Sequence, residues 1–353
     1  MSQTPKHEPE RRETRMHQEA AESAAVVAEL FSRSGAIIDS LAQALRNSPP
    51  PFVVTCARGS SDHAATYARY LVESRLGWPV VSAAPSISSV YQRELRVADA
   101  LFLAISQSGA SPDIVETARL ARNSGACVVA MVNTAESPLA ELANHVIPLR
   151  AGREFSIAAT KSYIASLAAI ARLTTGVVAD KSLAATLDRL PDQLQDAWQL
   201  DWTDGVAPLV GARNLFVVAR GVGFGIAREA ALKLKEVCAL HAEAFSAAEV
   251  KHGPMAIVDR GFPVLVFGQS DPANASIADV VDNFVRRGAT VMCTGPIDGV
   301  SGYRSLPGIE AGSPLLQPIL QIQTFYAAAN RLSLQRGLDP DRPNSLKKVT
   351  ETL

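Results

Sequence analysis

Residues 229–254, EAALKLKEVCALHAEAFSAAEVKHGP, bring together more acidic and basic side chains than any other part of the chain. The segment opens with apolar residues at helical spacing, which predicts an amphipathic helix. Lys233 and Glu236 stand three residues apart and would share one face of that helix, and His252 follows just before a Gly-Pro break. This set of groups suits proton transfer between neighbouring carbon atoms, although a solvated helix with ordinary Lys/Glu pairs has the same pattern.

The elements that must position these residues are short apolar runs alternating with longer helical patterns, which predict parallel sheets covered by helices. In the first half the expected strands are 52–57, 100–106, 126–132 and 145–149, and the expected helices are 62–76, 112–124 and 156–176. In the second half the expected strands are 214–219, 263–267 and 290–293, and the expected helices are 224–239, 275–287 and 314–336. Each half opens with an apolar strand that runs into a turn of small residues. We therefore expect two copies of one α/β unit, joined by a polar linker at 191–205.

Two loops of the first half are rich in hydroxyl groups, and each follows an expected strand. The polar side chains of these loops are those of Ser60, Ser61, Ser106, Gln107, Ser108 and Ser111. Ligands of open α/β sheets bind where strands end and helices begin. Pro112 suits the first position of a helix, which makes Ser111 its N-cap. The loops predict an uncharged cradle for a phosphate group, although helix capping alone explains many such loops.

Composition restricts the class of protein. The chain has 353 residues, 47% of them apolar, and a net charge of −1, which gives no electrostatic reason to expect binding to nucleic acid or to an anionic membrane. Its four cysteines form no CxxC pair, so we expect neither a zinc site nor disulfides, and no metal or other cofactor. No run of 18 apolar residues occurs, so a soluble cytoplasmic protein is expected. The first fifteen residues are charged and are expected to be a disordered leader.

The chain resembles a known family in several separate segments. These are SQSG at 106–109, AATKS at 158–162, ALKLKE at 231–236, HAEAFSAAEVKHGP at 241–254 and DRPNSLKKVT at 341–350. They resemble the isomerase half of glucosamine-6-phosphate synthase, which consists of two tandem sugar isomerase (SIS) domains. The resemblance implies an α/β fold in which each SIS domain is a mainly parallel sheet flanked by helices, a flavodoxin-like three-layer arrangement. It implies a leader at 1–15, a first domain at 16–190, a second at 205–336 and a tail at 337–353 that closes the active site.

The resemblance also implies a role for each candidate residue. The six polar side chains of the two loops would surround the sugar phosphate, with Ile157 and Thr160 as secondary contacts. Glu236 would carry a proton between C1 and C2 of the sugar. Lys233 would steady negative charge on a substrate oxygen, or it would simply pair with Glu229 at i,i+4.

Two further roles involve the partner subunit and the tail. His252 would open the sugar ring, reaching into the site from the other subunit of a homodimer. Lys348 would be the tail lysine that binds or encloses the open-chain sugar, with Lys347 as the alternative.

The synthases carry an amino-terminal glutaminase domain for which this sequence shows no counterpart. The chain therefore most resembles the isomerase-type glucosamine-6-phosphate deaminases, which convert glucosamine 6-phosphate to fructose 6-phosphate and ammonia. The alternatives are a deglycase of fructosyl-amino acid 6-phosphates, ammonia-dependent synthesis of glucosamine 6-phosphate, and a non-enzymatic sugar-phosphate sensor. Retention of Glu236, His252 and Lys348 argues against the sensor. The choice between glucosamine and galactosamine stays open, with glucosamine preferred.

Overall fold

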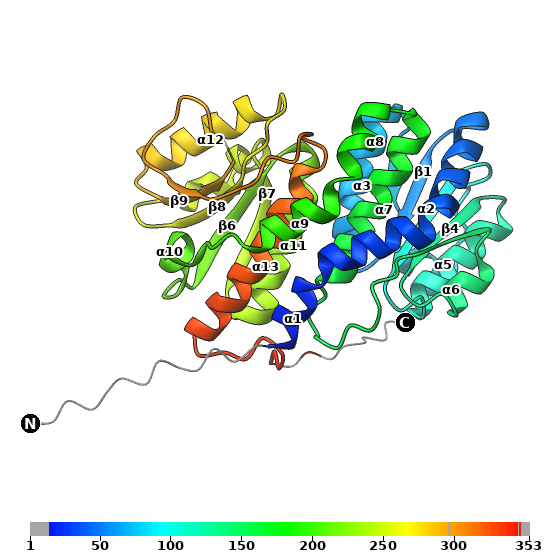
Figure 1. Cartoon of the computed structure of the whole chain (residues 1–353), viewed down its shortest axis with the longest axis horizontal. Coiled ribbons are helices and arrows are strands. Elements are labelled where there is room, and N and C mark those ends of the chain that lie inside the picture. The colour runs from blue at the N-terminus through cyan, green and yellow to red at the C-terminus, as the bar shows by residue number, and fades with distance from the viewer. Residues whose placement is uncertain (1–13, 296, 345, 347–353) are drawn as a thin grey trace, which may run out of the picture.

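The computed structural model describes residues 14–295, 297–344 and 346, and these form two α/β halves that lie side by side (Figure 1). The tail lysines Lys347 and Lys348, and residues 1–13 of the expected leader, lie outside the described residues. Helix α1 (Arg15–Ala21) already includes residue 15, because the Thr14 hydroxyl accepts the backbone N–H of His17 at 3.1 Å and caps the helix.

The first half contains a parallel sheet in the order β2-β1-β3-β4-β5. Its strands are β1 (Val53–Cys56), β2 (Val80–Ser82), β3 (Leu101–Ser106), β4 (Cys127–Val132) and β5 (His145–Pro148). The four predicted strands of this half are confirmed to within two residues at each end. β2 was missed because it is a three-residue edge strand with two exposed positions, so it lacks the apolar run that marks the others.

The second half contains a parallel sheet in the order β10-β9-β8-β6-β7. Its strands are β6 (Asn214–Ala219), β7 (His241–Ser246), β8 (Pro263–Phe267), β9 (Thr290–Thr294) and β10 (Arg304–Leu306). Counted from the first strand of each half, both sheets have the order 2-1-3-4-5, so the predicted duplication of one α/β unit is confirmed. β7 and β10 were missed, and both are partly exposed edge strands.

Helices cover both faces of each sheet. In the first half they are α1, α2 (Ser23–Asn47), α3 (Ser60–Leu76), α4 (Pro85–Ser89), α5 (Pro112–Asn123), α6 (Pro138–Leu142), α7 (Lys161–Val178) and α8 (Lys181–Leu187). The others are α9 (Leu190–Trp198), α10 (Thr203–Val206), α11 (Phe224–Cys238), α12 (Asn274–Arg286) and α13 (Gln317–Gln335), with short 3₁₀ turns η1 (Ala207–Leu209), η2 (Gly221–Gly223), η3 (Glu249–His252) and η4 (Pro254–Ile257). The polar segment expected as a linker at 191–205 thus contains most of α9 and of α10.

One continuous apolar core lies between the two sheets. Leu103 on β3 and Val217 on β6 belong to the same buried cluster, to which α3, α7, α11 and α13 also contribute. Figure 1 shows these helices in the middle of the molecule. The outer face of each sheet has its own smaller core, against α5 in the first half and α12 in the second.

The contact between α3 and α11 is unusually close. A Cβ atom on Gly225 would lie 2.8 Å from the His63 carbonyl oxygen and 3.0 Å from the Tyr67 backbone nitrogen. Only glycine therefore allows α11 to approach α3 at this point. The glycine-rich turn at 221–225 serves helix packing, and the packing brings side chains of the two halves together.

Helix α1 connects distant parts of the chain. The Asp341 carboxylate, from the C-terminal segment, accepts the backbone N–H groups of Arg15 at 2.8 Å and Met16 at 2.9 Å. At the other end of the same helix, the buried Glu19 carboxylate accepts the backbone N–H groups of Phe155 and Ser156. α1 thus fixes both the C-terminal segment and the loop that leads into α7.

Candidate active site

Glu229, Lys233 and Glu236 occupy one face of α11, as their spacing predicted. The Lys233 ammonium lies 2.5 Å from Glu236 Oε2 and 3.3 Å from Glu229 Oε1, so both proposed ion pairs of Lys233 are present. Burial disfavours the charged ammonium, but the two carboxylates outweigh burial and raise the pKa of Lys233. The Glu236 side chain keeps 19% of its surface exposed, so a ligand can reach it.

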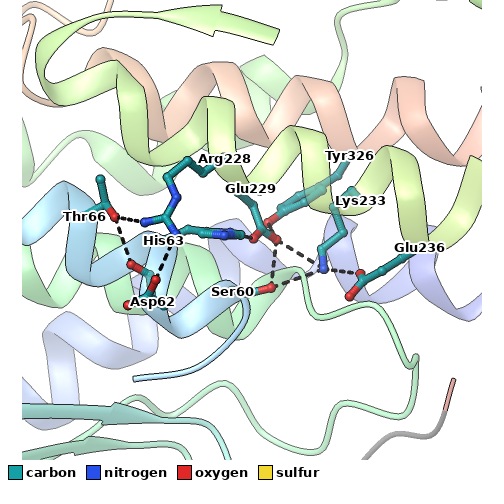
Figure 2. A network of polar contacts seen from close by, with 9 residues as sticks. All are labelled: Ser60, Asp62, His63, Thr66, Arg228, Glu229, Lys233, Glu236 and Tyr326. Carbon is teal, nitrogen blue, oxygen red and sulfur yellow. Dashed lines mark hydrogen bonds and ion pairs between the residues drawn. The ribbon is translucent and has the colours of Figure 1, made fainter. Parts of the chain in front are cut away.

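The Glu229 carboxylate is completely buried and joins the two halves of the molecule (Figure 2). It accepts hydrogen bonds from the Ser60 hydroxyl at 3.0 Å and the Tyr326 hydroxyl at 3.2 Å, and His63 Nδ1 lies 2.9 Å from its other oxygen. Burial acts to raise the pKa of Glu229, but Lys233 and His63 outweigh it and hold that pKa below its ordinary value. Glu229 therefore stays ionised and anchors Lys233.

A second polar contact reinforces the junction of α3 and α11. Arg228, next to Glu229, donates to the Asp62 carboxylate at 3.0 Å and to the Thr66 hydroxyl at 2.5 Å (Figure 2). Because Ser60, Asp62 and His63 all lie in the first turn of α3, the loop that carries Ser60 is held in register with the carboxylates of α11.

The two hydroxyl-rich loops lie beside each other at the carboxyl ends of β1 and β3. Ser60, Ser61 and Gln107 line one narrow hollow, together with Ser162, Tyr163 and Ser166 of α7. Arg58 bridges the two loops, since its guanidinium lies 2.7 Å from the buried Asp113 carboxylate in the first turn of α5. The arginine's charge is thus engaged within the protein.

The three serines of the second loop have different structural roles. The Ser106 hydroxyl accepts the N–H of Gly109 at 3.1 Å, and the Ser108 hydroxyl accepts the N–H of Ala110 at 3.2 Å, so both shape the loop. Ser111 is the N-cap residue of α5 with Pro112 at the first position, as predicted. Its hydroxyl makes no capping bond within the described chain and is accessible from solvent.

Glu154 organises the loop that approaches this hollow from β5. Its buried carboxylate accepts from the Gln107 amide at 2.7 Å, the Ser162 hydroxyl at 2.6 Å and the Thr160 backbone N–H at 2.9 Å. The helix predicted at 156–176 consequently starts only at Lys161. Thr160 is buried, and Ile157 is half-buried on the same loop.

His252 does not take part in this network within the described part of the chain. It is exposed on the turn η3 in the second half, and no hydrogen bond or ion pair is recorded between it and Glu236 among the described residues. Lys348 lies outside the described residues. The sequence predicted Glu229 only as a possible partner of Lys233. It did not predict that His63, Tyr326 and Glu154 belong to the site. Only His63 carried a sequence signal, because it follows Ser60 by three residues in a helical pattern.

Within the described chain, no helix is long and apolar enough to cross a membrane. Among the same residues, histidine, cysteine and acidic side chains do not gather in groups of three or more as metal ligands would.

The family model for the SIS domain matches this chain twice, over residues 51–175 and 209–294. The chain belongs to the SIS-domain family. The first match contains all the strands of its sheet, β1 to β5, and the second contains β6 to β9 and leaves out only the edge strand β10. Both halves of this SIS protein are therefore SIS domains. The predicted fold class is therefore confirmed.

Curated relatives of this SIS protein include the glutamine–fructose-6-phosphate aminotransferase (isomerizing) of Methanothermobacter thermautotrophicus. It is 34% identical over 305 residues, which cover 83% of this chain and 50% of the relative. The chain thus spans about half the length of the curated relatives that it matches.

Solved structures match this SIS protein along most of their length. A Silicibacter pomeroyi DSS-3 protein, described provisionally as a phosphosugar isomerase, is 42% identical with a TM-score of 0.89, covering 93% of this chain and all of that one. The glucosamine-6-phosphate deaminase of Thermotoga maritima has a TM-score of 0.73 at 19% identity and covers 96% and 100% of the two chains. The second match shows a shared fold.

Proposed function

We propose that this protein is an aldose–ketose isomerase of phosphorylated amino sugars that converts glucosamine 6-phosphate and water to fructose 6-phosphate and ammonia. The observation that carries the proposal is the partly exposed Glu236 carboxylate, held 2.5 Å from a buried, charged Lys233. Lys233 in turn lies 3.2 Å from the Ser60 hydroxyl at the edge of the hydroxyl-lined hollow. The relatives described as phosphosugar isomerases, aminotransferases and a deaminase support this class of substrate.

The phosphate would bind at the mouth of the hollow, whose own volume of about 20 Å³ is too small to enclose it. The amide of Gln107, the hydroxyls of Ser61 and Ser111, and the backbone N–H groups at the start of α3 offer donors without a net charge, while the Ser60 hydroxyl donates to Glu229. Ser106 and Ser108 would act by holding their loop in shape, and Ile157 and Thr160 would contact the sugar from the neighbouring loop.

Glu236 would then perform the isomerisation. In the open-chain aldose, it removes the proton from C2, which bears the amino group, and returns a proton to C1 of the enolamine. The C2 imine so formed reacts with water, breaking the C–N bond and releasing ammonia. Lys233 stays protonated because of its raised pKa, and it would stabilise the negative charge that develops on the substrate oxygen. The same steps in reverse give ammonia-dependent synthesis.

His252 and Lys348 complete the proposal. His252 would open the sugar ring in the site of a second subunit, and Lys348 would meet the open-chain sugar. Exposure of His252 in the single chain fits such a role, and the neighbouring Ile257 side chain on η4 is 61% exposed, as an apolar contact at a subunit interface would be.

Purified protein is expected to release ammonia and fructose 6-phosphate from glucosamine 6-phosphate in equal amounts. Both products can be followed by coupled dehydrogenase assays. Unphosphorylated glucosamine and N-acetylglucosamine 6-phosphate serve as controls, because one lacks the phosphate and the other has a blocked amine. Absence of both products would contradict the proposed function.

A mixed-dimer experiment tests the placement of His252. Glu236→Gln and His252→Ala homodimers should each be inactive. Co-expressing the two should restore about a quarter of wild-type activity, because half of randomly paired dimers then contain one intact site. If His252 acted within its own chain, every site in the mixture would carry one defect, and the mixture would stay inactive.

A further inference from the structure

Glu154 has no role in the proposed reaction, although its carboxylate lies between the loop after β3 and the start of α7. The residue is 6% exposed. It accepts the Thr160 backbone N–H at 2.9 Å and the Ser162 hydroxyl at 2.6 Å, and these bonds cap α7. It also accepts the Gln107 amide at 2.7 Å. Capping of α7 does not explain this last bond, because Gln107 belongs to the other loop.

The bond from Gln107 to Glu154 decides which end of the glutamine amide faces which way. The oxygen of an amide repels an anion and the nitrogen donates to it, and a half-turn of the side chain exchanges the two. All three partners of Glu154 donate to it, which is the pattern of an ionised carboxylate. Such a group only accepts, so the amide nitrogen must face Glu154. The nitrogen carries two hydrogens, and the second remains for an anion at the mouth of the hollow that Gln107 lines.

The carboxylate of Glu154 is itself held in place from two sides. On one side it caps α7, as described above. On the other, the next two residues, Phe155 and Ser156, donate their backbone N–H groups to the buried Glu19 of α1. Glu154 therefore cannot follow Gln107 if that side chain rotates, and it acts as a fixed acceptor for the amide.

We propose that Glu154 is a positioning residue for phosphate recognition, which holds the Gln107 amide with its nitrogen available to the phosphate. This inference rests on the proposed function, because it takes the phosphate of glucosamine 6-phosphate to bind at the mouth of the hollow. Glu154 does not touch the substrate, and proton transfer by Glu236 does not depend on it. Removal of its charge should therefore weaken binding and leave the chemical step intact.

Glu154→Gln tests this role, because it keeps the size of the side chain but can present an N–H group to Gln107. The Gln107 amide is then free to turn its oxygen towards the phosphate. KM for glucosamine 6-phosphate should rise about tenfold, the effect of one hydrogen bond to a charged group, with kcat close to wild type. The matched control Glu141→Gln, an exposed carboxylate on α6, should leave both constants unchanged.

A double-mutant cycle separates positioning from a purely structural role. Its readout is the calorimetric Kd for sorbitol 6-phosphate, which carries the phosphate but has no carbonyl group and cannot be isomerised. Gln107→Ala should weaken binding about tenfold, and adding Glu154→Gln to it should weaken binding no further. If Glu154 only capped α7, its substitution would have the same effect with and without Gln107, and that result overturns the proposal.

A crystal structure of the wild-type protein with sorbitol 6-phosphate gives a test that does not depend on the folding of a variant. Gln107 Nε2 should lie within hydrogen-bond distance of both the Glu154 carboxylate and the phosphate. A phosphate that Nε2 does not reach overturns the proposal.

The outcomes also separate this role from the reaction. Ammonia release by the wild type, together with equal Kd values for wild type and Glu154→Gln, overturns the positioning role and leaves the proposed function intact. Weaker binding by Glu154→Gln without ammonia release by the wild type supports the positioning role although the proposed reaction has failed. A wild-type protein that neither binds sorbitol 6-phosphate nor releases ammonia overturns both.

Discussion

Glu236→Gln should lower kcat for ammonia release from glucosamine 6-phosphate by about 10³-fold, within the range lost when a general base is removed. Glutamine keeps the size of the side chain and can still accept a hydrogen bond from Lys233, which also retains its contact with Glu229 at 3.3 Å. The amide cannot take up a proton from C2. The site should therefore stay assembled while the chemical step fails.

Steady-state kinetics and a binding measurement check this together. Kd for glucosamine 6-phosphate should change little in Glu236→Gln, since the phosphate contacts lie elsewhere. Glu310→Gln, an exposed carboxylate remote from the site in sequence, is the matched control and should behave as wild type. A Glu236→Gln protein with more than a tenth of wild-type kcat would show that another group carries the proton.

Glu229→Ala should destabilise the protein by about 3 kcal/mol, the lower end of the range for removing one partner of a buried ion pair. The substitution leaves the Lys233 ammonium, which is 1% exposed, with Glu236 as its remaining acidic partner. It also removes the acceptor of Ser60 and Tyr326 in the interior. The midpoint of urea unfolding, followed by circular dichroism, measures the loss.

A double substitution separates the lost pair from the lost packing. Glu229→Ala/Lys233→Met removes both charges, so it should be more stable than Glu229→Ala alone. If the double variant instead loses the sum of the stabilities lost by Glu229→Ala and Lys233→Met, the unpaired buried ammonium is not the cause of the destabilisation in Glu229→Ala.

The contribution of Glu229 to stability should depend on pH in one direction. The pKa of Glu229 lies below its ordinary value of 4.5 in the folded protein, so the unfolded chain binds its proton more readily. The ionised carboxylate therefore stabilises the fold above pH 4.5, and this contribution is lost as the pH falls through the lowered pKa. The pKa of Lys233 is raised, so its dependence on pH runs in the opposite direction. The charged ammonium stabilises the fold fully below pH 10.5, and this contribution is lost as the pH rises through the raised pKa. Urea unfolding of wild type and Glu229→Gln should accordingly differ most between these limits and converge towards acid.

The sequence predicted the central strands well because they are buried on both faces. β3 and β8 are runs of large apolar residues, a pattern that needs no knowledge of the rest of the chain. β7 has the sequence HAEAFS at a sheet edge, where half-exposed positions replace the apolar run. Its strand character depends on pairing with β6, which is a long-range contact.

The site was predictable only where its geometry is local. Lys233 and Glu236 share a helix turn, so their contact follows from spacing. Tyr326 reaches Glu229 across 97 residues of sequence, and Glu154 reaches Gln107 across 47, and no periodic pattern marks either pair. Both contacts result from the way the helices and loops pack once the halves have assembled.

The Asp341 cap on α1 has a practical consequence for anyone who modifies the ends of this protein. A purification tag or fusion partner that displaces residues 14–16 would remove the N–H groups that hold Asp341, and with them the anchor of the C-terminal segment. A deletion that includes Asp341 would uncap the helix whose Glu19 holds the loop before α7. Changes that reach residues 14–16 or Asp341 would therefore disturb both the C-terminal segment and the loop before α7.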